Sequence, residues 1–376
     1  MSTSRRSYLT GAAGSAFALT GLAGCLGGGG GSGSSTETTV TPTEDDPLVV
    51  SVFGGVFKEV LDEHLIQPFR EETGIPVESQ AQGGAANVLP KLESAVRGGN
   101  APVDVADMSA IGTLRGRHSD LWMSWSDDEF DNVSKVSDDL ITRASDSDEI
   151  VGVGSQAWFI NLVSNTEALA DPPTSWTALW DSQYEGQLGL LTPAQTSFLL
   201  DITAATHFDG EDLLSTKDGI TQVFEKLAAV KPQSSLWYTN EANFEAQLKS
   251  GDAPAGMLYN DVTVVMEENG APVTSTFVDE GSLLDSGRWV APRTSDKRGA
   301  IVEFIDYASR PEVQDTVSRN LYTAPTVEQQ HSSLDDETFE KIVGPGLDAA
   351  IVPNYEMYIE REQFINQQWN ELIIQS

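Results

Sequence analysis

The clearest pattern of apolar and polar positions spans residues 48–80. Residues 48–53 form a short apolar, β-branched run that ends at Gly54 and Gly55, and such a run is typical of a buried strand that turns into a helix. Apolar residues then recur at helical spacing until Gly74, which stops the helix before an extended run. The pattern therefore predicts a strand, a helix and a second strand parallel to the first.

In such a sheet, a ligand site lies outside the carboxyl ends of the strands. Phe53, Gly54 and Gly55 stand at one such end, where the glycines would let a ligand reach backbone N–H groups at a helix start. Alternatively, the glycines only make the turn. They match neither a dinucleotide fingerprint nor a P-loop. A second predicted strand, residues 102–108, places Ser109 at the same edge, as a cleft residue or a helix N-cap.

Two stretches of the chain resemble one protein family. Residues 53–77 read FGGVFKEVLDEHLIQPFREETGIPV and are similar to the opening of extracellular solute-binding proteins of ABC importers, in the cluster that includes the spermidine/putrescine binders. Residues 171–191 read DPPTSWTALWDSQYEGQLGLL and match a phrase that this family often carries. The resemblance implies a two-lobed α/β fold of the periplasmic-binding-protein type (type II), with mostly parallel sheets and hinge crossings. In such proteins a solute binds between the lobes and a hinge closes over it.

The resemblance also implies where the chain crosses between the lobes. A β-rich run at residues 150–164 leaves the first lobe, residues 279–292 resemble the return crossing, and residues 321–326 resemble a late tyrosine-proline crossing. We therefore expect lobe 1 at 47–153 and 283–319, lobe 2 at 156–279 and 322–376, and crossings near Val153, Glu280 and Tyr322.

Further cleft candidates follow from the family pattern. Tyr259 stands at a strand end where polyamine binders have an aromatic that can stack on a cation, and Asp261 would supply charge; the alternative is a surface strand end. Trp158 either lines the cleft or packs in the second lobe. In the polyamine branch a tryptophan and an aspartate hold the amine, and this chain has Asp285 and Gly287 at those positions, so one acid is kept near the place and the aromatic is displaced to Trp289. The full candidate ligand-binding set is Phe53, Gly54, Gly55, Ser109, Trp158, Tyr238, Tyr259, Asp261, Glu280, Asp285 and Trp289.

One departure from the polyamine branch bears on the solute. Residues 193–197 have none of the acidic side chains that polyamine binders carry at this junction, and an ammonium buried without a carboxylate is unfavourable. The ammonium groups of a diamine would need carboxylate partners elsewhere in the cleft, and Asp261, Glu280 and Asp285 could supply them. An organic cation such as putrescine or spermidine is the first expectation. An opine-like compound or other amino acid derivative, thiamine, or a small anion are the alternatives.

The composition adds information about the surface. The chain has 57 acidic and 22 basic residues, a net charge of −35, and the acidic residues are dispersed. Such a surface is typical of halophilic proteins, which stay soluble at high salt, and its self-repulsion should destabilise the fold at low salt. Nucleic acid is excluded as a partner because binding phosphates requires basic side chains. We expect a monomer whose partners, implied by the resemblance, are a small solute and the permease and ATPase of an ABC importer.

The N-terminus predicts an export signal, residues 1–24. Residues 4–9 resemble a twin-arginine motif, and the uncharged stretch after them is too short to span a bilayer. Residues 22–25 resemble a lipobox, so we expect Cys25 to carry a lipid at the outer face of the cell membrane. Cys25 is the single cysteine, which rules out an intrachain disulfide and cysteine-rich metal sites. Residues 25–46, rich in Gly, Ser and Thr, predict a flexible tether.

The sequence has no signature of catalysis. None of its 4 histidines stands in a metal-binding or triad spacing, and no Gly-x-Ser-x-Gly nucleophile elbow occurs. We expect neither a cofactor nor a metal site and do not expect an enzyme. A secreted hydrolase and a surface scaffold are the other classes that we consider.

Overall fold

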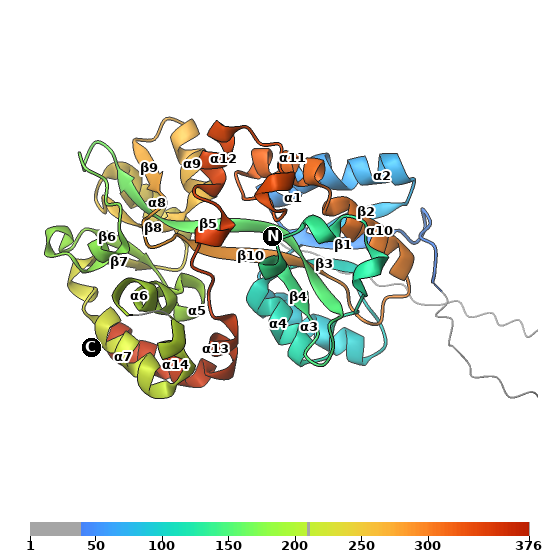
Figure 1. Cartoon of the computed structure of the whole chain (residues 1–376), viewed down its shortest axis with the longest axis horizontal. Coiled ribbons are helices and arrows are strands. Elements are labelled where there is room, and N and C mark those ends of the chain that lie inside the picture. Colours follow the sequence, from blue (N-terminus) through green and yellow to red (C-terminus); the bar gives the residue numbers. More distant parts are fainter. Residues whose placement is uncertain (1–38, 209–210, 376) are drawn as a thin grey trace, which may run out of the picture. The chain divides into compact units, whose positions relative to one another are not determined.

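The computed structural model describes residues 39–208 and 211–375 (Figure 1). The predicted signal, Cys25 and most of the predicted tether lie outside the described residues. Residues 39–46, which we expected to be tether, contact the folded domain: the Val40 N–H donates to the Asp296 carbonyl at 2.7 Å, and Lys297 pairs with Asp46 at 2.7 Å. The Lys297 side chain is 6% exposed, and a buried ammonium requires such a carboxylate partner. Within the described ranges, none of the helices combines the length and apolar character that a membrane span requires.

The described strands form one continuous hydrogen-bonded sheet, in the order β2-β1-β3-β10-β5-β8-β6-β7, with β4 and β9 also paired to β5. The ladders are parallel at both ends and antiparallel in the middle, around β5 and β10. We expected separate sheets in the two lobes, but β5 has 16 residues and is long enough to join them. The strands are β1 (Leu48–Phe53), β2 (Val77–Gln82), β3 (Val105–Ser109), β4 (Ile141–Arg143), β5 (Ile150–Asn165), β6 (Leu188–Leu191), β7 (Ser234–Tyr238), β8 (Ala255–Tyr259), β9 (Val273–Thr276) and β10 (Leu283–Val290).

The helices follow the periodicity of the sequence. The helix expected after Gly55 is present as α1 and α2, with a π-helical turn, Asp62–Ile66, between them and just before Pro68. Proline lacks an N–H group and disfavours a regular helix in the preceding turn, which accounts for the irregularity. The α-helices are α1 (Val56–Leu61), α2 (Gln67–Thr73), α3 (Ala85–Arg97), α4 (Ala110–His118), α5 (Ala194–Ser197), α6 (Leu199–His207), α7 (Lys217–Ala228), α8 (Glu241–Ser250), α9 (Asn260–Glu268), α10 (Arg298–Ala308), α11 (Pro311–Leu321), α12 (Asp336–Val343), α13 (Tyr355–Glu360) and α14 (Glu362–Trp369).

Two large hydrophobic cores define two lobes. The first core packs α1, α2, α10 and α11 against β1, and Phe69 and Phe304 meet there with ring centroids 5.3 Å apart. A smaller cluster under α3 covers the other face of the same strands. The second core packs α6, α7 and α14 around β6 and β8, and includes Phe224 and Trp369. We call the elements around the first core and the α3 cluster the first lobe, and those around the second core the second lobe.

In the described chain, β5, β10 and the segment after α12 connect the lobes. Strand β5 contributes Val153 to the first core and Ile160 to the second. The last crossing lies later than the expected position near Tyr322, because Val343 belongs to the first core and Ile351 to the second. After Tyr322 the chain first pairs with β5 and with a neighbouring segment of the first lobe. Figure 1 shows β5 and β10 running from one group of helices to the other.

Candidate functional site

A row of half-buried residues crosses the otherwise buried strands. Trp158 is the only residue of β5 that is not buried, and Asp285 is the only one of β10. Ser109 and Tyr259 are the only such residues of β3 and β8, and Phe53 ends β1 in the same half-buried state. These five residues were predicted from their places at strand ends and crossings. Their partial exposure indicates a single accessible strip on the sheet.

The strand register brings three of these side chains to one face. Asp285 lies directly opposite Trp158, and Tyr259 lies directly opposite Ile160, two residues further along β5. Because residues directly opposite each other and residues two positions apart share a face of a sheet, Asp285, Trp158 and Tyr259 point to the same side. Ser109 continues the row into the first lobe, where it lies opposite Gly287.

A pocket of about 230 Å³ opens over this strip. The first lobe contributes Phe53 and Phe57, whose rings meet edge to face at 6.3 Å, and the second lobe contributes polar groups at the starts of α8 and α9. The crossing strand β5 contributes Trp158 between them. The residues that line the pocket are Phe53, Phe57, Trp158, Glu241, Tyr259, Asp261 and Val262. The site is therefore aromatic on several sides and carries two carboxylates.

The pocket carboxylates lie in an environment that disfavours negative charge. The pKa of Asp261 is raised to about 7, chiefly by burial and also by the nearby Glu241 carboxylate, against the lowering effect of backbone N–H groups. Within the described chain, Oδ1 of Asp261 is buried and has no hydrogen-bond partner. Burial and then Glu245 raise the pKa of Glu241. No Lys or Arg is among the residues that line the pocket, so a positively charged solute would meet uncompensated acceptors.

The phenol of Tyr259 lies among several acids. Burial raises its pKa well above the usual value, with further increases from Asp285, Glu241 and, more weakly, Asp261. Three carboxylates thus act on one tyrosine. A cation placed against its ring would be attracted by the aromatic face and by these acids together.

Asp285 lies beside the pocket, next to Trp158. It accepts hydrogen bonds from the Ser286 N–H at 2.8 Å and the Tyr355 hydroxyl at 2.9 Å. Burial raises the pKa of Asp285, while these donors and the positive charge of Arg288 lower it. Arg288 itself is 4% exposed and donates to neutral oxygens, including Oγ of Ser286 at 2.8 Å. Asp285 therefore adds a third acid near the site without lining the pocket.

The structure does not bring all predicted residues to the pocket. Tyr238 is buried in the second core, where its hydroxyl donates to the Met257 carbonyl at 2.5 Å. Trp289 is 1% exposed and packs on Phe304 of the first core with ring centroids 5.3 Å apart. Glu280 accepts from the Ser175 hydroxyl and so holds the loop that begins with that residue. These three side chains stabilise the lobes.

The remaining predicted residues lie at the edge of the site. Gly54 and Gly55 are exposed at the start of α1 and do not line the pocket. Gly55 has φ 70°, and a Cβ there would meet no atom within 4 Å, so the turn requires glycine for its backbone conformation and not for clearance. Ser109 holds the N-cap position of α4 but makes no side-chain capping bond. Its hydroxyl therefore does not serve the capping role that we considered.

Phe57, Glu241 and Val262 line the pocket but were not predicted. Phe57 has the spacing of a core residue on the apolar face of its helix, and Glu241 resembles an ordinary acidic residue in a first helical turn. The sequence did contain a signal for Glu241. It is the first residue of α8, just after the N-cap Asn240, at the junction between β7 and that helix. Such junctions were used to predict Ser109 and Asp261.

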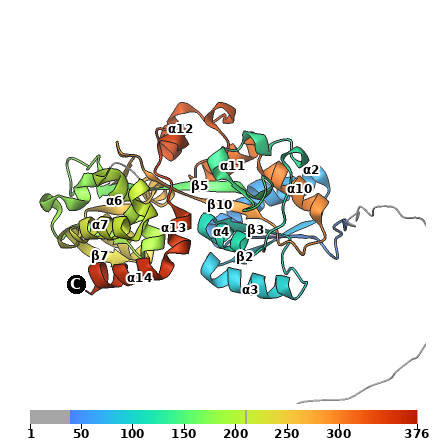
Figure 2. The ribbon, with the colours of Figure 1, turned by 60° about the horizontal axis from the view of Figure 1, so that its bottom comes forward.

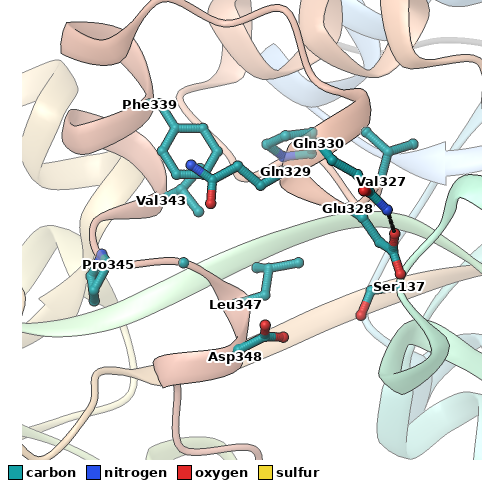
Figure 3. Close-up of a pocket in the computed structure, with 12 residues that line it drawn as sticks. Ser137, Val327, Glu328, Gln329, Gln330, Phe339, Val343, Pro345, Leu347 and Asp348 are labelled. Atoms are coloured by element: carbon teal, nitrogen blue, oxygen red, sulfur yellow. Dashed lines mark hydrogen bonds between the residues drawn. The ribbon is translucent and has the colours of Figure 1, made fainter.

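A larger cavity of about 540 Å³ lies elsewhere, where residues 325–330 meet α12 and the segment that follows it (Figure 3). Gln330 donates to Glu328 at 2.5 Å. Figure 3 shows this bond, with Phe339 and Asp348 also on the wall of the cavity. Among the described residues that line it, no buried polar side-chain atom lacks a partner. The cavity therefore has no polar group that calls for a solute, in contrast to the pocket at Asp261.

Comparisons with known proteins agree with this geometry. Residues 64–340 match the family described as bacterial extracellular solute-binding protein. The chain is 23% identical over 334 residues to the gamma-aminobutyric acid-binding protein of Pseudomonas aeruginosa, covering 87% of this chain and 91% of that protein. It is 20% identical over 295 residues to the spermidine/putrescine-binding periplasmic protein of Escherichia coli, covering 78% and 82%.

The same fold occurs among solved structures. The crystal structure of a putative extracellular solute-binding protein from Bordetella parapertussis superposes with a TM-score of 0.74 at 16% identity, covering 88% of this chain and 100% of that chain. The two-lobed α/β fold of type II periplasmic binding proteins, expected from the sequence, is confirmed.

Proposed function

We propose that this chain, which belongs to the bacterial extracellular solute-binding protein family, captures a small organic cation outside the cell membrane and delivers it to the permease of an ABC importer. A polyamine such as putrescine or spermidine is the solute that we favour. One observation carries the proposal: a pocket between the lobes joins aromatic rings with two carboxylates and has no basic side chain.

The chemistry of this pocket suits an ammonium group. Trp158 and Tyr259 offer aromatic faces, which attract cations most strongly when water is excluded. Asp261 offers a buried oxygen without a partner, which would accept a charge-assisted hydrogen bond. An anionic solute would meet two carboxylates and no donor with positive charge, so a small anion is disfavoured.

The acids around the pocket support a solute with more than one ammonium group. The pocket volume of about 230 Å³ is below the range of drug-sized sites, so it suits an ammonium group on a short chain. Asp285 lies beside the pocket, directly opposite Trp158 on the neighbouring strand, and would meet a second ammonium group. The carboxylates at and beside this pocket could therefore pair with both ammonium groups of a diamine, although residues 193–197 contain no acidic side chain.

Gamma-aminobutyrate is the second candidate, because a relative with that name matches most of the chain. It shares a terminal ammonium group with putrescine but replaces the other by a carboxylate. That carboxylate would approach Asp285, and the neighbouring Arg288 is buried and already donates to neutral oxygens. The local charge therefore favours the diamine.

The lobes and the anchor complete the proposal. The first lobe comprises residues 47–153 and 283–343 and the second 156–279 and 351–376, with the boundaries revised from the core membership of Val343 and Ile351. Cys25 carries the lipid after the signal is removed, and the closed form, as a monomer, is recognised by the permease. Relatives and fold are those of binding proteins rather than enzymes.

A thermal-shift panel in molar salt tests the solute. Putrescine, spermidine, gamma-aminobutyrate, glycine betaine and phosphate are compared at equal concentration. A solute at about 100 times its Kd stabilises the folded state by about 2.7 kcal/mol, so the diamines should raise Tm by several degrees. The double variant Asp261→Asn and Glu241→Gln should lose the response, whereas Glu245→Gln, one turn further along α8, should keep it. A response to phosphate and to none of the amines would refute the proposal, and consumption of the bound solute would indicate an enzyme.

A further inference from the structure

Helix α4 of the first lobe lies beside α13 of the second (Figure 2). Helix α4 follows directly after Ser109, and α13 begins at Tyr355, whose hydroxyl donates to Asp285. Both helices therefore start at the strip that underlies the pocket. Ala110, the first residue of α4, is 4% exposed and belongs to the second core, so the lobes are in close contact here.

Ion pairs join the two lobes, from α4 to α13 and to the start of α14. Nη2 of Arg115 lies 2.8 Å from Oε1 of Glu362, and Nε2 of His118 lies 3.3 Å from Oε2 of Glu356. Arg117 also pairs with Glu356. The three basic residues stand in the last turn of α4, where the helix dipole favours positive charge. The chain has only 22 Lys and Arg against 57 acidic residues, so this concentration of basic side chains is a marked local exception.

Neither helix needs these pairs to hold its place in its own lobe. Helix α4 packs on Trp122, whose Nε1 donates to the Thr113 carbonyl at 2.7 Å. Helix α13 is held by Tyr358, whose hydroxyl donates to Asp201 at 2.5 Å and whose ring meets Phe198 edge to face. The pairs therefore fix the two lobes relative to each other. They are partly exposed, with side-chain exposures between 20% and 44%, so salt screens them.

We propose that these five residues, Arg115, Arg117, His118, Glu356 and Glu362, form a latch that holds the lobes together without solute and weakens as salt concentration rises. The latch residues are absent from the pocket lining. The proposal goes beyond solute capture, because it concerns how the empty protein divides between closed and open forms. Its test uses no solute, so its failure is distinct from failure of the proposed function.

Electron spin-echo distances between two spin labels measure this division. The full chain carries Cys25→Ser, which removes the single native thiol, and labels at Lys91→Cys on α3 and Gln367→Cys on α14, both exposed. Distances are recorded at about 0.3 M and about 3 M KCl, a range over which the screening length falls about threefold. Circular dichroism at each salt concentration confirms that the protein is folded.

We expect a short, closed distance to dominate in the otherwise unchanged chain at the lower salt concentration. Glu356→Lys replaces the carboxylate partner of Arg117 and His118 with a third basic side chain and should lower the ratio of closed to open forms several-fold. The exchange of Arg117→Glu with Glu356→Arg should restore part of the closed population. The higher salt concentration should shift the ratio of closed to open forms in the unchanged chain toward the ratio in the variant. If Glu356→Lys does not fold, the milder Glu362→Gln should shift the same ratio in the same direction.

A matched control breaks an ion pair inside one lobe. Arg310 lies 2.6 Å from Glu72, with exposures of 27% and 56%, and both residues belong to the first lobe. Glu72→Lys should leave the distances unchanged. Three outcomes would each overturn the latch: an open distance alone in the unchanged chain at low salt, equal distances in that chain and in the latch variants, or an equal shift in Glu72→Lys.

Discussion

Asp261→Asn should stabilise the empty protein while weakening solute binding. The fold raises the pKa of Asp261 from 3.8 to about 7, chiefly through burial. An acid with a higher pKa in the folded state binds its proton more tightly when folded, so the free energy of unfolding falls as pH rises from 3.8 to about 7. Asparagine has nearly the same shape and cannot ionise. The variant should therefore escape this loss of stability.

The size of the effect follows from the shift. A rise from 3.8 to about 7 corresponds to at most about 4 kcal/mol, at about 1.4 kcal/mol per pH unit. The residue as a whole is half-buried, and solvent screening reduces this value, so we expect a gain of about 2 kcal/mol at about pH 8 and almost none at about pH 4. Glu241, whose pKa is also raised, is unchanged in this variant. It accounts for the pH dependence of stability that the variant retains.

Solute binding should show the opposite dependence. A cation needs the ionised carboxylate, and with a pKa of about 7 the ionised fraction of Asp261 falls to about 1% at about pH 5. The Kd for putrescine should therefore rise about 100-fold between about pH 8 and about pH 5. In Asp261→Asn the affinity should be lower and the pH dependence much flatter.

Two measurements check these expectations. Denaturant unfolding at constant molar salt gives the stability of both proteins across the pH range. Calorimetric titration with putrescine in two buffers of different ionisation enthalpy gives the number of protons released, which we expect to be about 0.9 per solute at about pH 6. Glu245→Gln serves as the control. An Asp261→Asn variant less stable than the parent at the higher pH, or an unchanged Kd over this range, would refute the reasoning.

Three further substitutions give independent tests. Trp158→Ala should weaken cation binding roughly tenfold by calorimetry, because it removes an aromatic face of the pocket. Lys297→Met should cost about 3 kcal/mol in denaturant unfolding, because it leaves the buried Asp104, 3.2 Å away, without its cation; solute affinity should not change. Gly189→Ala should lower Tm by several degrees and cost about 2 kcal/mol, because its Cβ would lie 2.1 Å from the Phe244 ring in the second core.

The places of the site residues along the strands could be predicted from the sequence. Strand ends and glycine turns located Phe53, Ser109 and Tyr259, because the period of a strand and its stop are local properties. The directions of side chains were harder to predict. Trp289 has the same aromatic character as Trp158, but it lies where α10 covers the sheet, and that contact joins segments far apart in sequence.

The joining of the two sheets could not be predicted from the sequence for a similar reason. It depends on β10 pairing with β3 and with β5, and no local pattern in the sequence specifies those partners. The late crossing at Ile351 likewise depends on where α12 packs, and Lys341 on that helix pairs with Glu267 of the second lobe at 3.8 Å although Val343 lies in the first core. Helix α12 therefore contacts both lobes. Lobe boundaries drawn from the sequence assign each segment to one lobe and miss this double contact.

The pocket and the charge of the whole chain act in the same direction. A net charge of −35 already favours the approach of cations from a distance, but that attraction is largely screened in molar salt. Inside the pocket, Asp261 and Glu241 are close and partly removed from water, so salt screens their interaction with a bound cation much less. Raising the salt concentration should therefore slow the association of putrescine more than it raises the rate of its dissociation from the pocket. Stopped-flow measurement of tryptophan fluorescence separates the two rates. A dissociation rate that rises more steeply with salt than the association rate falls would contradict this expectation.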